Sequence, residues 1–252
     1  MTRPVKAAIL SFTELDTDQH HVFNEWHRYD HQPEQFTVEG IVAATRVVAT
    51  PDLLARRHVT DAALVPTKYF GYYLISDPVQ ETFNALGDMV PALKAQGRWY
   101  ERRRGPSVGN RLVEMYASPN IVSAPAAIPF RPHQGIFVTV DDPKPTASTR
   151  DLDAEHERHE ATNVREILKM PGVAGCWSFE HLAPYSIPGT PYKMPERRAM
   201  RVYWLHGSPD EFLASWDALV NIKPAAHARA YTSVFAGAYR FIPPDSKFDW
   251  FD

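Results

Sequence analysis

The sequence predicts an α+β fold built from two tandem β-α-β-β-α-β units, because two independent patterns occur twice. A polar amphipathic stretch that ends in a glycine and a small apolar run sets Gly40 on Gly172, at an offset of 132 residues. An aromatic strand followed by an X-Pro step sets Tyr72 on Tyr203, at an offset of 131 residues. Two anchors that agree within one residue indicate that both halves share one element order.

The first unit is expected to span residues 1–116. Pro33 disfavours continuation of the first helix beyond His31, whereas Pro78 is harmless in the first turn of the second helix. Apolar, β-branched and aromatic runs mark the strands. The expected elements are a strand at 5–13, a helix at 18–31, strands at 41–49 and 68–75, a helix at 78–96 and a strand at 111–116.

The second unit, residues 133–242, follows a linker at 117–132 that carries four prolines and no periodicity. Its expected strands are 135–140, 173–179, 199–205 and 233–241, and its expected helices are 152–169 and 209–220. This is the ferredoxin-like order, in which both helices cover one face of the sheet. The two units are expected to pack their bare faces sheet to sheet, as in a closed barrel.

Three further segments lie outside this repeated order. Residues 50–67 and 183–198 are matching insertions between the middle strands of each unit, and either is a candidate lid. Residues 243–252 form an aromatic and acidic tail. The tail is predicted to dock on a partner subunit or on the surface of its own chain.

The composition is that of a globular protein without a strong field of one sign. Of 252 residues, 44% are hydrophobic, and 27 basic residues against 30 acidic ones leave a net charge of -3. Neither nucleic acid nor a membrane is therefore an expected partner. Cys176 is the single cysteine, which fits a reducing compartment, and no signal peptide or membrane span is recognisable. We expect a soluble cytoplasmic protein.

One helix motif in the first unit resembles a known family. Residues 24–34, NEWHRYDHQPE, are followed by Val-Glu-Gly at 38–40. This pattern is similar to the EthD-like group of the dimeric α+β barrel superfamily, although His27 replaces the usual tyrosine and Glu39 the usual proline. The positions in register with that group are Trp26, Asp30, His31, Pro33 and Gly40.

The resemblance implies a ligand cavity between helices and sheet within one unit. Similar proteins include lactone isomerases, polyketide cyclases, cofactor-free oxygenases and haem-degrading enzymes, so the fold alone does not assign the activity. The motif has decayed in the second unit, where Arg158, Thr162 and Asn163 stand at three of its positions. We therefore expect one functional site, in the first unit, and a mainly structural second unit.

His31 and His27 are the main catalytic candidates, because residues four apart on a helix share one face. An imidazole beside Trp26, tuned by the carboxylate of Asp30, suits proton transfer at carbon or oxygen. Tyr72 is expected to donate a hydrogen bond to a substrate carbonyl or oxyanion. The structural alternatives are that His31 stabilises a helix C-terminus and that Tyr72 belongs to the core.

Substrate binding is expected from the motif helix, the aromatic strand and the run WYERRR at 99–104. Side chains alternate along a strand, so one residue of the pair Tyr72 and Tyr73 points toward the helices and the other into the barrel. The arginines at 102–104 suit a carboxylate or phosphate, although a solvated turn explains them equally. The expected binding residues are Trp26, Tyr29, Tyr73, Trp99 and Arg102.

No cofactor is expected, and two alternatives stay open. The spacing of His27 and His31 also fits a divalent metal, completed by Asp30 or by His156 and His159 of the other unit. Those two helices are expected on opposite outer faces, which makes the second pairing awkward. Haem needs only one histidine over an apolar cavity.

These residues favour a cofactor-independent general acid-base enzyme of catabolism, a lyase, isomerase or cyclase, acting on a small apolar or aromatic carbonyl compound. One alternative is a cofactor-free or haem-dependent oxygenase of the same fold. Another is a non-catalytic ligand-binding or stress-associated barrel protein. The expected partner is a small-molecule substrate, with possible assembly into a homodimer or other homo-oligomer.

Overall fold

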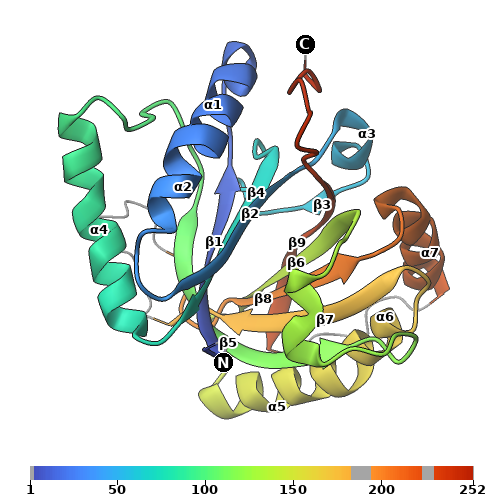
Figure 1. Cartoon of the computed structure of the whole chain (residues 1–252). Helices are drawn as coiled ribbons and strands as arrows, with labels where there is room; N and C mark the ends of the chain where they lie inside the picture. Colours follow the sequence, from blue (N-terminus) through green and yellow to red (C-terminus); the bar gives the residue numbers. More distant parts are fainter. Residues whose placement is uncertain (1–2, 183–193, 223–229, 252) are drawn as a thin grey trace.

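Strands from both halves form one closed sheet in the computed structural model, which describes residues 3–182, 194–222 and 230–251. The first half contributes β1 (Val5–Thr13), β2 (Ile41–Val48), the short β3 (His58–Val59), β4 (Tyr69–Ser76) and β5 (Ser107–Ala117). The second half contributes β6 (Gly135–Pro143), β7 (Val173–Glu180), β8 (Ala199–Leu205) and β9 (Tyr231–Phe241). Their order is β2-β4-β1-β5-β7-β8-β6-β9-β3, and an additional pairing of β2 with β9 closes the barrel (Figure 1).

Helices cover the outside of the barrel on two sides (Figure 1). The first half supplies α1 (His20–Trp26), the π-helical segment η2 (His27–His31), α2 (Gln32–Gln35), α3 (Pro51–Leu54) and α4 (Val79–Ala95). The second half supplies α5 (Thr149–His159), the π-helical segment η4 (Glu160–Val164), α6 (Arg165–Leu168) and α7 (Pro209–Ile222). The predicted α+β, ferredoxin-like barrel is confirmed. Within the described residues, no helix has the length and apolar character needed to cross a membrane.

The first insertion and the tail pack onto the barrel. In the first insertion, β3 pairs with β9 of the other half. Residues 183–193, most of the second predicted lid, lie outside the described part of the chain. The tail docks on its own chain, where Trp250 and Phe251 pack against a cluster that contains Phe23 and Tyr69. The guanidinium of Arg28 also lies 4.8 Å from the ring centre of Phe248.

The first helix does not end at His31, as the sequence predicted, but continues through α2 to Gln35. Proline clashes with the carbonyl four residues earlier in a regular α-helix, and a π-turn relieves that clash by widening the preceding backbone. Here η2 directly precedes the turn that contains Pro33. The second half has a π-turn at the same place without a proline, so Pro33 is accommodated by this turn and is not its cause.

The glycine anchor of the two halves is confirmed, but the tyrosine anchor is wrong by one residue. Gly40 has φ +94° and Gly172 has φ +80°, and their carbonyls accept hydrogen bonds from the N–H groups of Ser76 and His206. A Cβ on Gly40 would lie 2.1 Å from Thr82 Oγ1, so glycine is required there.

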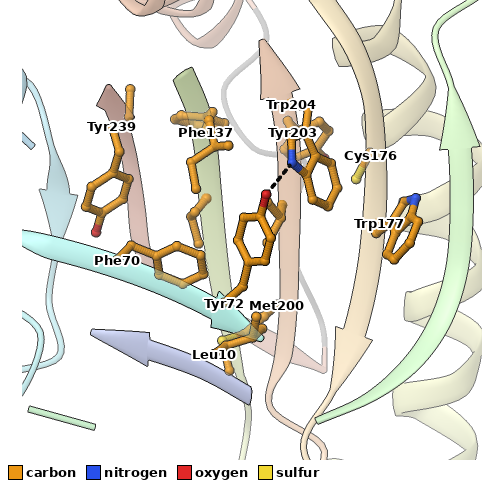
Figure 2. Close-up of a cluster of buried hydrophobic side chains, with 14 of the residues drawn as sticks. Leu10, Phe70, Tyr72, Phe137, Cys176, Trp177, Met200, Tyr203, Trp204 and Tyr239 are labelled. Atoms are coloured by element: carbon orange, nitrogen blue, oxygen red, sulfur yellow. Dashed lines mark hydrogen bonds between the residues drawn. The ribbon is translucent and has the colours of Figure 1, made fainter. Parts of the chain in front are cut away.

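Strand register shows why the tyrosine anchor moves. Tyr73 pairs with Ala44, and Tyr203 pairs with Cys176, which makes Tyr73 the counterpart of Tyr203. One residue changes the face of the sheet on which a side chain lies. Tyr72 therefore points into the barrel interior, where its Oη accepts a hydrogen bond of 3.4 Å from Trp204 Nε1 (Figure 2).

Tyr72 is expected to matter for stability. It is 3% exposed and packs edge to face on Trp204, with ring centres 5.9 Å apart. Tyr72→Ala should lower the free energy of unfolding by about 3 to 5 kcal/mol, because it leaves a large cavity and an unpaired indole N–H. Tyr29→Ala, at a residue 69% exposed, should change it by less than about 0.5 kcal/mol in urea unfolding. Equal effects of the two substitutions would contradict the assignment of Tyr72 to the core.

Candidate functional site

A cavity of about 910 Å³ lies between the helices and the sheet of the first half. Its floor consists of outward-facing strand residues, among them Ile9 and Ser11 of β1 and Tyr73 of β4. Gly71, on the same face of β4, adds no side chain, which leaves the floor open at this point. The strands thus place a hollow under η2 and α4, where the sequence predicted a site.

The walls of the cavity are largely aromatic. Phe23, Trp26, Trp99 and Tyr100 line it. The Tyr100 ring lies edge to face on Phe23, with centres 5.2 Å apart, and Trp26 Nε1 donates to the Arg98 carbonyl at 2.7 Å. These contacts tie the helix motif to the loop after α4. The aromatic walls suit a flat aromatic ligand, and the polar and charged side chains that also line the cavity can bind a polar group on that ligand.

His27 and Tyr73 form the polar pair at the floor of the cavity. Tyr73 Oη lies 3.3 Å from His27 Nε2. Burial, with a smaller effect of Arg46, holds the pKa of His27 well below its usual value, so its imidazole is neutral at pH 7. Burial also raises the pKa of Tyr73 to about 12, which keeps the phenol protonated and able to donate. Tyr73, rather than Tyr72, is thus the tyrosine that the structure brings to the cavity.

His31 lines the same cavity one turn further along the helix. Its ring stacks on Trp26 with centres 4.5 Å apart, and the ring of His27 is 5.4 Å away. Burial, reinforced by the charge of Arg103, lowers the pKa of His31 to about 3. Its Nδ1 is buried and has no hydrogen-bond partner among the described residues. The site therefore holds two neutral imidazoles, one of them with a free ring nitrogen.

Two arginines complete the site: Arg46, which the sequence analysis did not select, and Arg103, which belongs to the arginine run 102–104. Arg46 of β2 and Arg103, in the loop before β5, line the cavity, and both lower the pKa of His27 and His31. Burial lowers the pKa of Arg46 itself to about 9. A signal for Arg46 exists in the sequence, because it is the one charged residue in the apolar strand IVAATRVV.

Four of the predicted residues lie elsewhere. Asp30 points away from His31 and forms an ion pair of 2.9 Å with Arg98. Arg102 is exposed and pairs with Asp16 and Asp18 outside the cavity. Tyr72 lies in the barrel core, as described above. Tyr29 lines an adjoining pocket of about 350 Å³, which meets the main cavity at His27 and Arg46.

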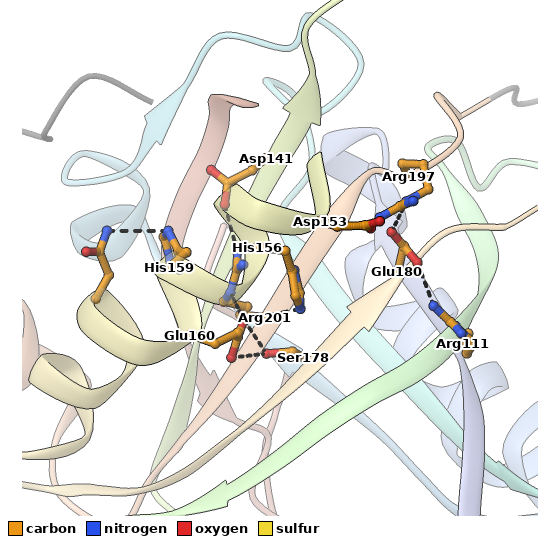
Figure 3. Close-up of polar contacts among 11 residues, drawn as sticks. Arg111, Asp141, Asp153, His156, His159, Glu160, Ser178, Glu180, Arg197 and Arg201 are labelled. Atoms are coloured by element: carbon orange, nitrogen blue, oxygen red, sulfur yellow. Dashed lines mark hydrogen bonds and ion pairs between the residues drawn. The ribbon is translucent and has the colours of Figure 1, made fainter. Parts of the chain in front are cut away.

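The corresponding region of the second half is filled by ion pairs (Figure 3). Arg201 donates to Glu160 Oε1 at 2.7 Å and to Asp141 Oδ2 at 2.8 Å. Ser178 donates to the same carboxylate of Glu160. His159 lies nearby, and burial lowers its pKa to about 2. Arg201 thus has two carboxylate partners within its own half.

The residues around His31 do not suit an axial haem ligand or a metal centre. A histidine bound to iron ordinarily donates its second N–H to a carboxylate or carbonyl. His31 Nδ1 has no such acceptor among the described residues, and Asp30 is engaged by Arg98. Within the same residues, no group of three or more His, Cys, Asp or Glu side chains is placed to hold a metal ion.

Fold and site together define a class: an α+β barrel whose first half has a cavity lined by aromatic residues, histidines and arginines. Comparison with family profiles gives no match, and comparison with curated proteins gives none either. Among solved structures, DyPB from Rhodococcus jostii RHA1 matches with a TM-score of 0.51 and 11% identity, over 99% of this chain and 96% of that chain.

Two further structures have similar folds. A variant chlorite dismutase from Candidatus Nitrospira defluvii matches with a TM-score of 0.50 and 11% identity, over 99% of this chain and 96% of its own. An anthrone oxidase-like protein matches with a TM-score of 0.50 and 12% identity, over 94% of this chain and 92% of its own. At these identities the likeness shows the dimeric α+β barrel type of fold alone.

The low pKa of His31 predicts sensitivity to acid. With a pKa of about 3 in the folded state against an ordinary value of 6.5, the imidazole stays neutral where the unfolded chain binds a proton. This group therefore leaves stability unchanged above about pH 6.5, and the free energy of unfolding falls as the pH drops toward 3. The urea midpoint should fall less between pH 7 and pH 4 in His31→Phe than in wild type. The same fall in both proteins would contradict the buried, neutral state.

Proposed function

We propose that the first-half cavity is the active site of a cofactor-independent acid-base enzyme that removes a proton from an aromatic carbonyl compound. The observation that carries the proposal is the pair of neutral imidazoles, His27 buried and His31 half-buried, beside an aromatic cavity of about 910 Å³. A neutral imidazole accepts a proton from an acidic C–H or O–H group, and because burial disfavours the imidazolium that forms, the bound substrate must raise the pKa of His31 for this transfer.

Each of the site residues has a separate role in the proposed reaction. His31, which lines the cavity, takes the proton. Tyr73 remains protonated and donates to the oxyanion that forms on the substrate carbonyl, with His27 as its hydrogen-bonded neighbour. Trp26 and Trp99 hold the aromatic body of the substrate. Return of the proton to a different atom completes an isomerisation or cyclisation.

An enolate formed in the same way can instead react with oxygen, and this is the second candidate. It is favoured by the oxidase-like name of a fold neighbour. For a ketone with an activated methylene, one O₂ converts CH₂ to C=O and releases one water. The two candidates share the proton-abstraction step and differ in what consumes the carbanion.

We also infer that the first half belongs with the EthD-like group and that the two halves arose by tandem duplication. The motif around Trp26 and His31 supports the first point. The common order β-α-β-β-α-β and the matched glycines Gly40 and Gly172 support the second.

Anthrone, an aromatic ketone with an acidic methylene, is a suitable probe for proton abstraction. Wild type should catalyse exchange of its methylene protons with deuterium, followed by NMR under nitrogen. His31→Gln should lower the catalysed rate by about 10²- to 10⁴-fold, with a melting temperature close to that of wild type. His21→Gln is the matched control, because His21 lies on the same helix with its side chain 61% exposed. Exchange that survives in His31→Gln, or that is absent from wild type with anthrone, would refute the proposal.

An oxygen electrode separates the two candidates. If the enzyme is an oxygenase, one O₂ disappears per anthrone and His31→Gln abolishes the uptake. If it is an isomerase or cyclase, deuterium exchange proceeds without uptake above the spontaneous rate. A binding protein would show neither activity.

A further inference from the structure

Arg46 is a buried cation that the described residues only partly satisfy. It is 8% exposed, and its Nη2 donates to Asn24 Oδ1 at 2.5 Å. Its Nε and Nη1 are buried and have no hydrogen-bond partner. The ring of Phe23 lies 4.8 Å from the guanidinium carbon, which adds a cation-π contact but no acceptor. Unpaired charge in such a place is costly, so the arrangement calls for an anion.

The second half shows what an arginine at this position requires. Arg46 of β2 pairs with Gly71 of β4, whereas Ser178 of β7 pairs with Arg201 of β8. These two cross-strand pairs occupy corresponding positions in the two halves. Each pair contains one arginine, which lies on β2 in the first half and on β8 in the second half. Arg201 receives two carboxylates, Glu160 and Asp141 (Figure 3).

The first half lacks these carboxylates. Strand register sets Asp141 opposite Ala199 and Thr13 opposite Tyr69, so Thr13 stands where Asp141 does. Arg46 lines both the cavity and the adjoining pocket, where the neighbouring Arg28 carries the same charge and lowers the pKa of Arg46 further. A carboxylate from a ligand can therefore form with Arg46 the ion pair that Glu160 and Asp141 form with Arg201.

The remaining charges around the cavity reinforce this conclusion. Arg103 also lines the cavity and has no hydrogen-bond partner among the described residues. The two acids on the cavity lining are already paired, Glu14 with Arg104 at 2.9 Å and Glu101 with Lys94 at 3.2 Å. The cavity is thus cationic at its polar end and aromatic along its walls.

We propose that Arg46, together with Arg103, binds a carboxylate carried by the aromatic substrate. The guanidinium of Arg46 forms the charge-assisted contact, and the aromatic body lies along Trp26 and Trp99. This inference names the substrate class of the proposed active site and therefore rests on that function. The substrate is an aromatic carbonyl compound that also bears an acidic group, and the arginines select it against neutral analogues.

Calorimetric titration with 2-naphthoate and 2-naphthamide tests the proposal, because the two probes match in size and differ in charge. Wild type should bind the carboxylate at least about tenfold more tightly than the amide. Arg46→Gln should weaken naphthoate binding by about tenfold to a hundredfold, with little change for the amide, and Arg46→Lys should restore part of the loss. Arg56→Gln is the control, because Arg56 pairs with Asp217 on the surface.

Two results would overturn the proposal. One is equal affinity of wild type for the two probes, which needs no variant and so stands even if Arg46→Gln does not fold. The other is a folded Arg46→Gln, by near-UV circular dichroism, that keeps the full preference for naphthoate.

Failure of the anion site and failure of the proposed function are distinguishable. His31→Gln should keep the preference for naphthoate over naphthamide, since His31 contributes no positive charge at neutral pH. A preference of wild type for naphthoate without exchange of the anthrone protons would support the anion site and contradict the acid-base function. Proton exchange by wild type without a preference for naphthoate would support the acid-base function and contradict the anion site.

Discussion

Alternation of side chains along the strands of a closed barrel decides which residues form the core and which form the site. One face of each strand points to an interior shared by both halves, and the other points to the helices. Tyr72 therefore contacts Trp204 across the barrel, whereas Tyr73 contacts His27 in the cavity. Because the period is two residues, core and site cannot exchange members without a shift of register that would turn every side chain of β4 to the other face.

Compensation of buried charge explains why the two halves differ although they share a topology. In the second half, Glu160 and Asp141 form ion pairs with Arg201 and compensate its buried charge. In the first half, Gly71 leaves space, and Arg46 finds an amide and aromatic rings but no carboxylate. A buried, unpaired arginine of this kind is expected where an anionic ligand binds and pairs with its charge. The same position thus stabilises one half and leaves a binding site in the other.

The helix that carries the histidines is held by contacts outside the cavity. Arg98, just after α4, forms ion pairs with Asp30 and Glu34, and its carbonyl accepts the Trp26 indole N–H. These bonds fix the stack of Trp26 on His31 without placing a carboxylate beside the imidazole. The histidines therefore remain neutral among cations, and a bound anion would raise their pKa toward that of an effective base.

The sequence by itself determined the order of the elements, the paired turns at Gly40 and Gly172 and the helix that carries His27 and His31. Each of these depends on local backbone preferences, on hydrophobic periodicity or on a contiguous motif. Tertiary structure decided that Tyr73 and not Tyr72 reaches the cavity, that Asp30 belongs to Arg98, and that Arg46 and Arg103 belong to the site. Those outcomes depend on strand register and on contacts between residues distant in sequence, and a shift of one residue in register reverses the face on which a side chain lies.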